Sequence, residues 1–301
     1  MKQQQFRGTG VALVTPFRNG RIDFPALERV IEHVIAGGVD FLVSLGTTGE
    51  AVTLSDREVR EVLDATIRIN NGRKPLVAGV FGDNDTARLV QKVREFDFTG
   101  IDVIMSSSPA YNKPNQEGIY RHYMALAEVA PRPVIIYNVP SRTGSNVEAE
   151  TVLRLAEASD QFFAVKEASG DLQQVMTILK YKPDDFLVLS GDDLITLPMI
   201  GCGGDGVISV IANALPGPFA GMARAALAGN YEEAQRLNAQ LLDIHPWLYI
   251  DGNPAGVKGA LELLGVCSKE VRLPLAPISD EHLAALQKEL ERAGVLEGSR
   301  G

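Results

Sequence analysis

The chain has 301 residues, is 45% hydrophobic and carries a formal charge of −9 at pH 7. This length is sufficient for one barrel-sized domain with an appendage. The acidic balance, with no stretch rich in lysine and arginine, argues against a nucleic-acid partner.

Two further features of the sequence concern the compartment. There is no run of about 18 or more apolar residues, so no transmembrane helix and no membrane partner are expected. The segment Met1–Phe6 has no apolar signal core, and two cysteines are too few for a disulfide framework. A cytoplasmic protein with reduced thiols is therefore predicted.

The first half of the chain alternates short apolar runs with amphipathic segments. Asp23 is predicted to cap a first helix that ends at Gly37–Gly38. Ser55 and Glu58 form a capping-box pattern ahead of a second helix. Helical patterns also follow the third and fourth runs. The expected strands are residues 10–14, 41–45, 75–80 and 101–105.

The second half continues the alternation up to about residue 229. The expected strands are residues 133–137, the run that ends in Lys166, residues 186–190 and residues 206–210. Eight strand–helix units predict parallel pairing, and they favour a closed (β/α)8 TIM barrel over an open doubly wound sheet. Beyond residue 229 only helical patterns occur. We therefore expect a catalytic barrel over residues 1–229 and a small C-terminal helical region over residues 230–301.

Lys166 lies within Phe162–Gly170, a stretch that otherwise has the pattern of a buried strand. Buried strands rarely contain an ammonium group, because its desolvation is costly. One interpretation is a strand-end lysine that pairs with a carboxylate or extends to water. The other is a lysine whose burial favours the neutral amine, which can attack a carbonyl and form a Schiff base.

Residues with hydroxyl groups or charged side chains also follow other predicted strands. They lie at the carboxyl ends of the strands, where (β/α)8 barrels have their active sites. Tyr137 ends the strand next to that of Lys166, so the two side chains are expected to lie close together. The segment Gly46–Glu50 offers backbone N–H groups and hydroxyls that suit a small carboxylate. Each feature alone has an ordinary structural explanation, and their coincidence at one end of a barrel favours a site. The residues at these strand ends are Thr47, Thr48, Tyr111, Tyr137, Arg142, Lys166, Gly191 and Ile208.

Two other patterns in the sequence do not indicate a site. Gly201–Gly206 has the spacing of a dinucleotide-binding glycine motif, but it precedes a predicted strand instead of linking a strand to a helix. The four histidines are scattered over predicted helices and form no metal-ligand pair. The sequence therefore predicts neither a cofactor nor a metal ion for the chemistry.

Five motifs together resemble the pyruvate-dependent class I aldolase superfamily. The resemblance extends from Gly8 to about residue 290 and is strongest to the synthases that condense pyruvate with L-aspartate 4-semialdehyde in lysine and diaminopimelate biosynthesis. The motifs are Gly46–Glu50, Tyr137–Gly144, Val165–Gly170, Leu189–Asp193 and Gly206–Val210.

The resemblance implies a role for each catalytic residue. Lys166 would form the Schiff base with pyruvate, and Tyr137 would be the central proton donor and acceptor. Thr47 would link Tyr137 to Tyr111, which in this superfamily reaches into the site from a neighbouring subunit. The resemblance therefore implies a homodimer or homotetramer.

The resemblance also implies the binding residues. Thr48 would hold the pyruvate carboxylate through its backbone N–H and its hydroxyl group. Arg142 would hold the carboxylate of L-aspartate 4-semialdehyde. Gly191 and Ile208 would offer backbone carbonyls near that second substrate.

Two alternative functions remain open at this point. A sugar-acid lyase of the same superfamily, of the N-acetylneuraminate or 2-keto-3-deoxygluconate type, would keep Lys166 and Tyr137. Sialic acid lyases lack an arginine at the position of Arg142, so Ser141–Thr143 favours the synthase. A barrel that binds a small acid without catalysis is the other alternative, and the full set of site residues argues against it.

Four positions depart from the pattern of synthases that L-lysine inhibits. Ala110 stands where many members have a second tyrosine, and Asp56 and Val59 replace histidines. Arg88 replaces a glutamate that would bind the lysine ammonium, and a cation at this position repels lysine. The sequence therefore predicts a synthase that is insensitive to L-lysine.

Overall fold

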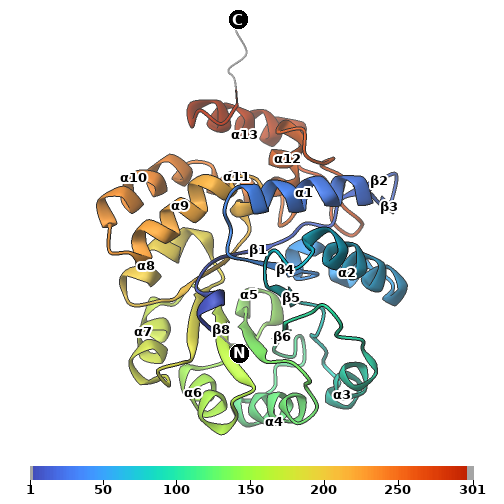
Figure 1. The fold of residues 1–301 in the computed structure, drawn as a ribbon, viewed down its shortest axis with the longest axis vertical. Coiled ribbons are helices and arrows are strands. Elements are labelled where there is room, and N and C mark those ends of the chain that lie inside the picture. The colour runs from blue at the N-terminus through green and yellow to red at the C-terminus, as the bar shows by residue number, and fades with distance from the viewer. Residues whose placement is uncertain (1–2, 297–301) are drawn as a thin grey trace, which may run out of the picture.

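A closed barrel of eight parallel strands forms the centre of the molecule (Figure 1). The computed structural model describes residues 3–296. The strands of the barrel are β1 (Gly8–Ala12), β4 (Phe41–Ser44), β5 (Leu76–Ala78), β6 (Val103–Ser107), β7 (Val134–Asn138), β8 (Phe162–Glu167), β9 (Leu187–Ser190) and β10 (Gly206–Ser209). They follow one another around the barrel in chain order, and β10 pairs with β1 to close it. The prediction of a (β/α)8 TIM barrel is confirmed.

Helices surround the barrel and bury the outward side chains of the strands. These helices are α1 (Phe24–Ala36), α2 (Asp56–Asn70), α3 (Thr86–Glu95), α4 (Gln116–Ala127), α6 (Ala149–Ala158), α7 (Leu172–Tyr181), α8 (Thr196–Gly201) and α9 (Pro216–Leu227). Inward side chains form a second apolar cluster inside the barrel. Phe6 belongs to this cluster and is the last residue of the 3-10 helix η1 (Gln3–Phe6). The centroid of its ring lies 5.4 Å from that of Phe41 and 5.3 Å from that of Phe163.

The predicted helix caps are confirmed. The Asp23 carboxylate accepts a hydrogen bond from the backbone N–H of Ala26, and α1 ends at Gly37. Ser55 and Glu58 form a complete capping box at the start of α2. The sequence did not reveal a small antiparallel hairpin of β2 (Phe17–Arg18) and β3 (Arg21–Ile22), because strands of two residues are too short to show alternation.

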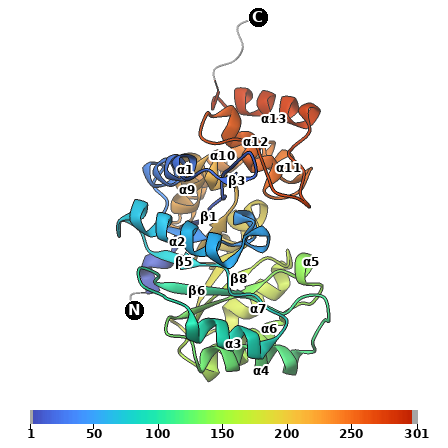
Figure 2. The same cartoon turned by 90° about the vertical axis from the view of Figure 1, so that its right-hand side faces the viewer.

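The described residues after 229 contain four helices: α10 (Tyr231–Leu242), α11 (His245–Tyr249), α12 (Ala255–Leu263) and α13 (Asp280–Arg292). Figures 1 and 2 show α12 near α1 at one side of the barrel, with α13 farther out. Helix α13 packs on α11 and α12. Helix α10 packs on α9. The division between residues 1–229 and 230–301 remains a prediction, and residues 1–2 and 297–301 lie outside the described part. None of the helices described could span a membrane.

Candidate functional site

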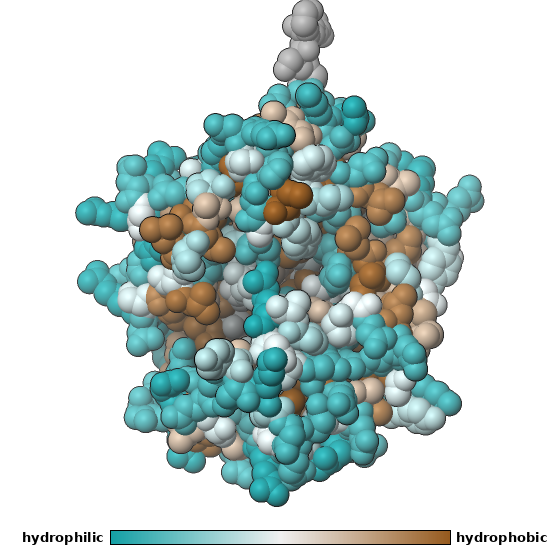
Figure 3. All heavy atoms as spheres, turned by 180° about the vertical axis from the view of Figure 1, so that it is seen from behind, coloured by the Kyte–Doolittle hydropathy of each residue, from teal (hydrophilic) through white to brown (hydrophobic). Residues whose placement is uncertain are grey.

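The carboxyl ends of the barrel strands enclose a cavity of about 420 Å³. Figure 2 shows that this end, marked by α5 (Pro140–Thr143), lies opposite the N-terminus. Figure 3 views it from outside, where brown patches interrupt a mostly teal surface. Three of the predicted site residues line the cavity, namely Thr47, Tyr137 and Arg142. A larger and more open cavity of about 950 Å³ is lined by residues at the amino ends of strands, away from the predicted chemistry.

Lys166 and Tyr137 lie side by side on β8 and β7, where they are direct register partners. The Lys166 Nζ atom lies 4.2 Å from the centroid of the Tyr137 ring. Both residues are buried, with exposures of 5% and 7%. Among the residues that the structure describes, no carboxylate forms an ion pair with Lys166. Its burial and this lack of a counter-charge disfavour both structural explanations, a salt bridge and an extension to water.

Gly191, just after β9, leaves the space that the lysine side chain occupies. A Cβ atom at this position would lie 3.2 Å from Lys166 Cε and 2.6 Å from Ala168 Cβ, which is too close for a side chain. Ile208 is buried on β10 and belongs to the apolar cluster inside the barrel. The backbone-carbonyl roles of Gly191 and Ile208 remain predictions.

A buried polar network outside the barrel holds the ends of β7 and β8 together. The Glu167 carboxylate accepts hydrogen bonds from Asn138 Nδ2 at 2.9 Å and from Gln174 Nε2 at 2.9 Å. It also accepts one from the backbone N–H of Ser169 at 2.7 Å. Side chains alternate across a strand, so the network on the outer face fixes the inward direction of Lys166 and Tyr137.

The turn after β4 contains both predicted threonines. It comprises the 3-10 helices η2 (Thr47–Gly49) and η3 (Ala51–Thr53). Thr48 is 2% exposed, and its Oγ1 accepts a hydrogen bond from Asn253 Nδ2 at 3.0 Å. Leu45 and Glu50, which flank η2, adopt φ angles of 60° and 53°. Left-handed conformations at non-glycine residues are strained and persist only where the surroundings enforce them.

Tyr111 and Arg142 lie at the rim of this end of the barrel. The Tyr111 side chain is 91% exposed, its φ angle is 67°, and its backbone N–H donates to the Thr143 carbonyl at 3.0 Å. Ala110 lines the cavity, whereas Tyr111 does not. A single chain therefore places Thr47, Tyr137 and Arg142 around the cavity and Lys166 against Tyr137, and it leaves Tyr111 exposed. Thr48 and Lys166 themselves do not line the cavity.

Three residues outside the predicted site form contacts of the turn after β4, namely Glu50, Asn253 and Lys258. The Lys258 ammonium and the Glu50 carboxylate form an ion pair of 2.5 Å, and both side chains are fully buried. Burial lowers the pKa of Lys258, and the charge of Glu50 opposes this shift. Glu50 and Lys258 are each charged residues in a segment of otherwise small or apolar residues, and this pattern could have drawn attention to them. The sequence does not show that the two residues pair with each other.

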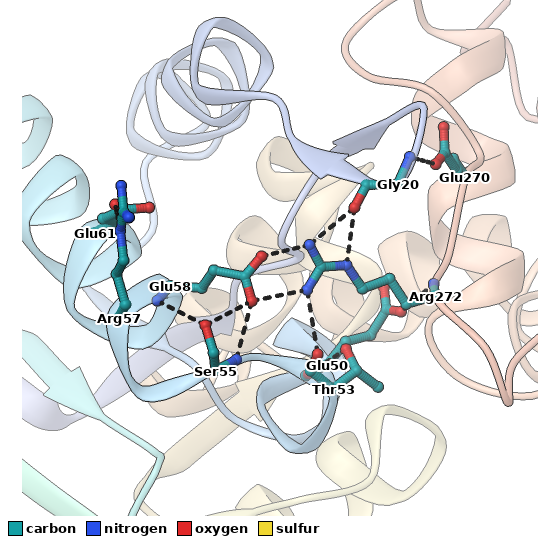
Figure 4. Close-up of polar contacts among 9 residues, drawn as sticks. All are labelled: Gly20, Glu50, Thr53, Ser55, Arg57, Glu58, Glu61, Glu270 and Arg272. Carbon is teal, nitrogen blue, oxygen red and sulfur yellow. Dashed lines mark hydrogen bonds and ion pairs between the residues drawn. The ribbon is translucent and has the colours of Figure 1, made fainter.

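Arg272 connects this region to the capping box of α2. Its guanidinium donates to Glu58 Oε1 at 2.6 Å, to the Thr53 carbonyl at 3.1 Å and to the Gly20 carbonyl at 2.9 Å (Figure 4). One side chain of the C-terminal region thus joins the β2–β3 hairpin, η3 and α2.

The Glu58 carboxylate is expected to stabilise the fold in a pH-dependent way. Arg272 and the Ser55 N–H lower the pKa of Glu58 from 4.5 to about 2. The folded chain therefore binds this proton less readily than the unfolded chain, and the stabilisation is complete above pH 4.5 and lost as the pH falls towards 2. Glu58→Gln should lower the free energy of unfolding by about 1 kcal/mol at neutral pH. Urea unfolding of both proteins should show this difference shrinking on acidification; a constant difference would contradict the prediction.

Comparison with known proteins gives a consistent result over most of the chain. The family model described as "Dihydrodipicolinate synthetase family" matches residues 5–293. The 4-hydroxy-tetrahydrodipicolinate synthase of Cytophaga hutchinsonii is 45% identical over 94% of this chain and 95% of its own length. That of Flavobacterium psychrophilum is 48% identical over 92% and 95%. The solved structure of DHDPS from Cyanidioschyzon merolae with lysine bound has a TM-score of 0.92 at 36% identity, covering 96% of this chain and 99% of that one. The chain belongs to the dihydrodipicolinate synthetase family.

Proposed function

We propose that the protein condenses pyruvate with L-aspartate 4-semialdehyde, in lysine and diaminopimelate biosynthesis, through a Schiff base on Lys166. Membership of the family makes the chain a carbon–carbon-bond-forming lyase of the class I aldolase type. One observation carries the assignment of the nucleophile. Lys166 is a buried lysine without a counter-charge in the described structure, and it packs against Tyr137 beside a cavity at the carboxyl end of the barrel.

The chemistry requires several proton transfers within this cavity. The Lys166 amine attacks the pyruvate carbonyl, water leaves, and the resulting imine draws electrons from the methyl group. Loss of a methyl proton gives an enamine, which attacks the aldehyde carbon. Tyr137 lies next to the amine and lines the cavity together with Thr47, so both hydroxyl groups suit proton transfer. The imine forms on the protein itself, so the proposal includes no cofactor and no metal ion.

The binding residues follow from the chemistry of the two substrates. The N–H and hydroxyl groups of Thr48 lie in the strained turn after β4, where they suit the pyruvate carboxylate. Arg142 lines the cavity from α5, and its planar guanidinium suits a second carboxylate. Gly191 and Ile208 remain our candidates for backbone contacts to the aldehyde substrate.

The protein is proposed to act as a homodimer or homotetramer in the cytoplasm. Tyr111 is 91% exposed and Val52 is 98% exposed, while the neighbouring Ala110 and Val52 itself line the cavity. Exposed apolar residues at the rim of a site are suited to contact with a second copy of the chain. In such a dimer, the Tyr111 hydroxyl of one copy would lie over the cavity of the other. Sedimentation equilibrium would test the assembly, and a strictly monomeric active enzyme would overturn it.

Steady-state kinetics would test the function directly. Pyruvate and L-aspartate 4-semialdehyde are varied together, and the product is followed through the next, reductase-catalysed step. Saturable turnover with parallel double-reciprocal lines is expected, because pyruvate must form the imine before the aldehyde binds. A folded protein that shows no such turnover, but cleaves a sialic or 2-keto-3-deoxy sugar acid, would replace this proposal with the sugar-acid lyase. A protein with no pyruvate adduct would be a non-catalytic barrel.

Arg142→Ala is expected to impair binding of the aldehyde and spare the reaction with pyruvate. Loss of a guanidinium that holds a carboxylate should raise the KM for L-aspartate 4-semialdehyde about 100-fold. Arg142→Lys keeps the charge without the planar fork and should recover only part of the loss. Borohydride trapping of the pyruvate adduct should proceed as in the wild type. An unchanged KM for the aldehyde in Arg142→Ala would remove Arg142 from the site.

L-Lysine is expected not to inhibit the enzyme. By the resemblance, Arg88 stands where lysine-inhibited synthases have a glutamate that would bind the lysine ammonium. Its guanidinium forms an ion pair of 2.6 Å with Asp83. The Asn84 side chain accepts a hydrogen bond from the Ala110 N–H at 2.7 Å, so Ala110 lies beside the segment between Asp83 and Arg88. Steady-state rates with and without millimolar L-lysine would check this, with a lysine-inhibited member of the family as positive control. Substantial inhibition of this protein would contradict the prediction.

A further inference from the structure

A buried ion pair lies directly behind the turn that carries Thr47 and Thr48. Glu50 ends η2, and Lys258 lies in α12 of the C-terminal region, 208 residues away along the chain. The Lys258 ammonium donates to Glu50 Oε1 and to the Glu270 carbonyl at 2.8 Å, and it lies 4.3 Å from the centroid of the Phe17 ring. The other Glu50 oxygen accepts the backbone N–H of Arg272 at 2.9 Å. Every polar atom of the pair is thus satisfied.

The pair is expected to take no direct part in the chemistry, because both side chains are fully buried and each of their polar atoms already has a partner within the protein. Neither Glu50 nor Lys258 lines the cavity, although Thr47 and Ala51 on either side of Glu50 do. A buried ion pair is also a poor source of stability, because the desolvation of both charges offsets most of their attraction and apolar residues often replace such a pair without loss. What the pair supplies here is geometric, since it ties one turn of the barrel to a distant helix.

Glu50 controls the conformation of the turn through its own backbone. Its N–H donates to the Thr47 carbonyl at 3.0 Å, and its carbonyl accepts the Thr53 N–H at 2.9 Å. The residue is held at a φ angle of 53°, in the left-handed region. A side chain anchored on Lys258 supplies the restraint that keeps this strained conformation. Figure 4 shows Glu50 directed from the turn towards the segment that bears Arg272.

A second contact from the same region acts on the same turn. Asn253, which precedes α12, donates to Thr48 Oγ1 at 3.0 Å, and its own side-chain oxygen is buried without a partner among the described residues. Asn253 and Lys258 therefore hold the turn at Thr48 and at Glu50, on both sides of Gly49. The C-terminal region contributes to the site in this way without lining it.

We infer that Glu50 and Lys258 are positioning residues, whose buried ion pair sets the orientation of Thr47 and Thr48 towards pyruvate. The inference rests on the proposed function, because it assumes that this turn holds the pyruvate carboxylate and takes part in proton transfer.

The test compares Glu50→Gln, Lys258→Met and the double variant with a control variant in another ion pair. Asp205→Asn is the control, because Asp205 is 7% exposed and forms ion pairs with Arg7 and Lys182 near the amino ends of the strands. Both single variants should raise the KM for pyruvate and lower kcat/KM about 10- to 100-fold, since small displacements of a binding group are costly. Asp205→Asn should lower the unfolding temperature and leave the KM for pyruvate unchanged.

The double variant separates positioning from simple stability. Removal of both charges leaves no unpaired buried charge, so the unfolding temperature should recover towards that of the wild type. The KM for pyruvate should stay raised, because the anchor of Glu50 is still missing. Recovery of both quantities in the double variant, or an unchanged KM for pyruvate in both single variants, would overturn the inference.

Amide hydrogen exchange gives a readout that does not depend on turnover. Exchange should become faster in residues 45–54 of Glu50→Gln and Lys258→Met and should stay unchanged there in Asp205→Asn. A wild-type protein without turnover would overturn the proposed function, while the exchange data would still show whether the pair holds the turn. Unchanged exchange in residues 45–54 of both variants would overturn the inference by itself.

Discussion

Replacement of Lys166 by alanine is expected to abolish the covalent pyruvate adduct and to lower kcat by about a thousandfold or more. The other buried lysine of the site region, Lys258, is neutralised by Glu50 and cannot substitute for it. Lys166 has no such partner, and its amine lies against Tyr137 at the carboxyl end of β8. The loss should affect the first chemical step, so no later intermediate should form.

Intact-mass analysis after treatment with pyruvate and borohydride would measure this effect. The wild type should gain the mass of one reduced pyruvate adduct, and Lys166→Ala should gain none. Lys258→Met is the control for the identity of the lysine and should still be modified at saturating pyruvate. An adduct on Lys166→Ala would show that another amine forms the imine.

Replacement of Tyr137 by phenylalanine is expected to lower kcat by about 10²- to 10⁴-fold, the usual contribution of a general acid or base. The ring that packs 4.2 Å from Lys166 Nζ is preserved, so the position of the lysine should not change. The pyruvate adduct should therefore still form, and the defect should lie in the steps that transfer protons.

Tyr123→Phe is the matched control for this variant. Tyr123 is fully buried in α4, and its hydroxyl donates to the Ser106 carbonyl at 2.9 Å, outside the residues that line the cavity. Its removal should cost about 1 kcal/mol of stability and leave kcat unchanged. Pre-steady-state trapping and steady-state rates on both variants would separate the two effects. A Tyr137→Phe enzyme with wild-type kcat would exclude Tyr137 as the proton donor and acceptor.

The sequence was sufficient to predict the features that depend on local patterns. Strand–helix alternation predicted the barrel, and the capping box at Ser55 and Glu58 is confirmed. The neighbouring positions of Tyr137 and Lys166 followed from parallel pairing of consecutive strands, and their register is direct. Gly191 was selected by its place after β9, and the structure adds the reason why a larger residue does not fit there.

Features that depend on distant pairing were not predictable. Glu50 was noted only as the last residue of a glycine-rich turn, and nothing in its neighbourhood indicates that its partner lies on α12. The contact from Asn253 to Thr48 spans a similar distance along the chain. Tyr111 is a site residue by resemblance alone, and its own chain leaves it 91% exposed. The proposed second copy is what would bring this side chain to a site.

The distance along the chain between Glu50 and Lys258 has a consequence for biosynthesis on the ribosome. The turn after β4 is made early, but the helix that anchors it emerges only after all eight barrel strands have been translated. Chain synthesis proceeds from the N-terminus, so the strands of a nascent barrel are available before the turn after β4 is anchored. With the roles proposed above, the nascent chain contains Lys166 before it contains the anchor of the turn that would hold pyruvate. Competence for catalysis would then follow the translation of α12.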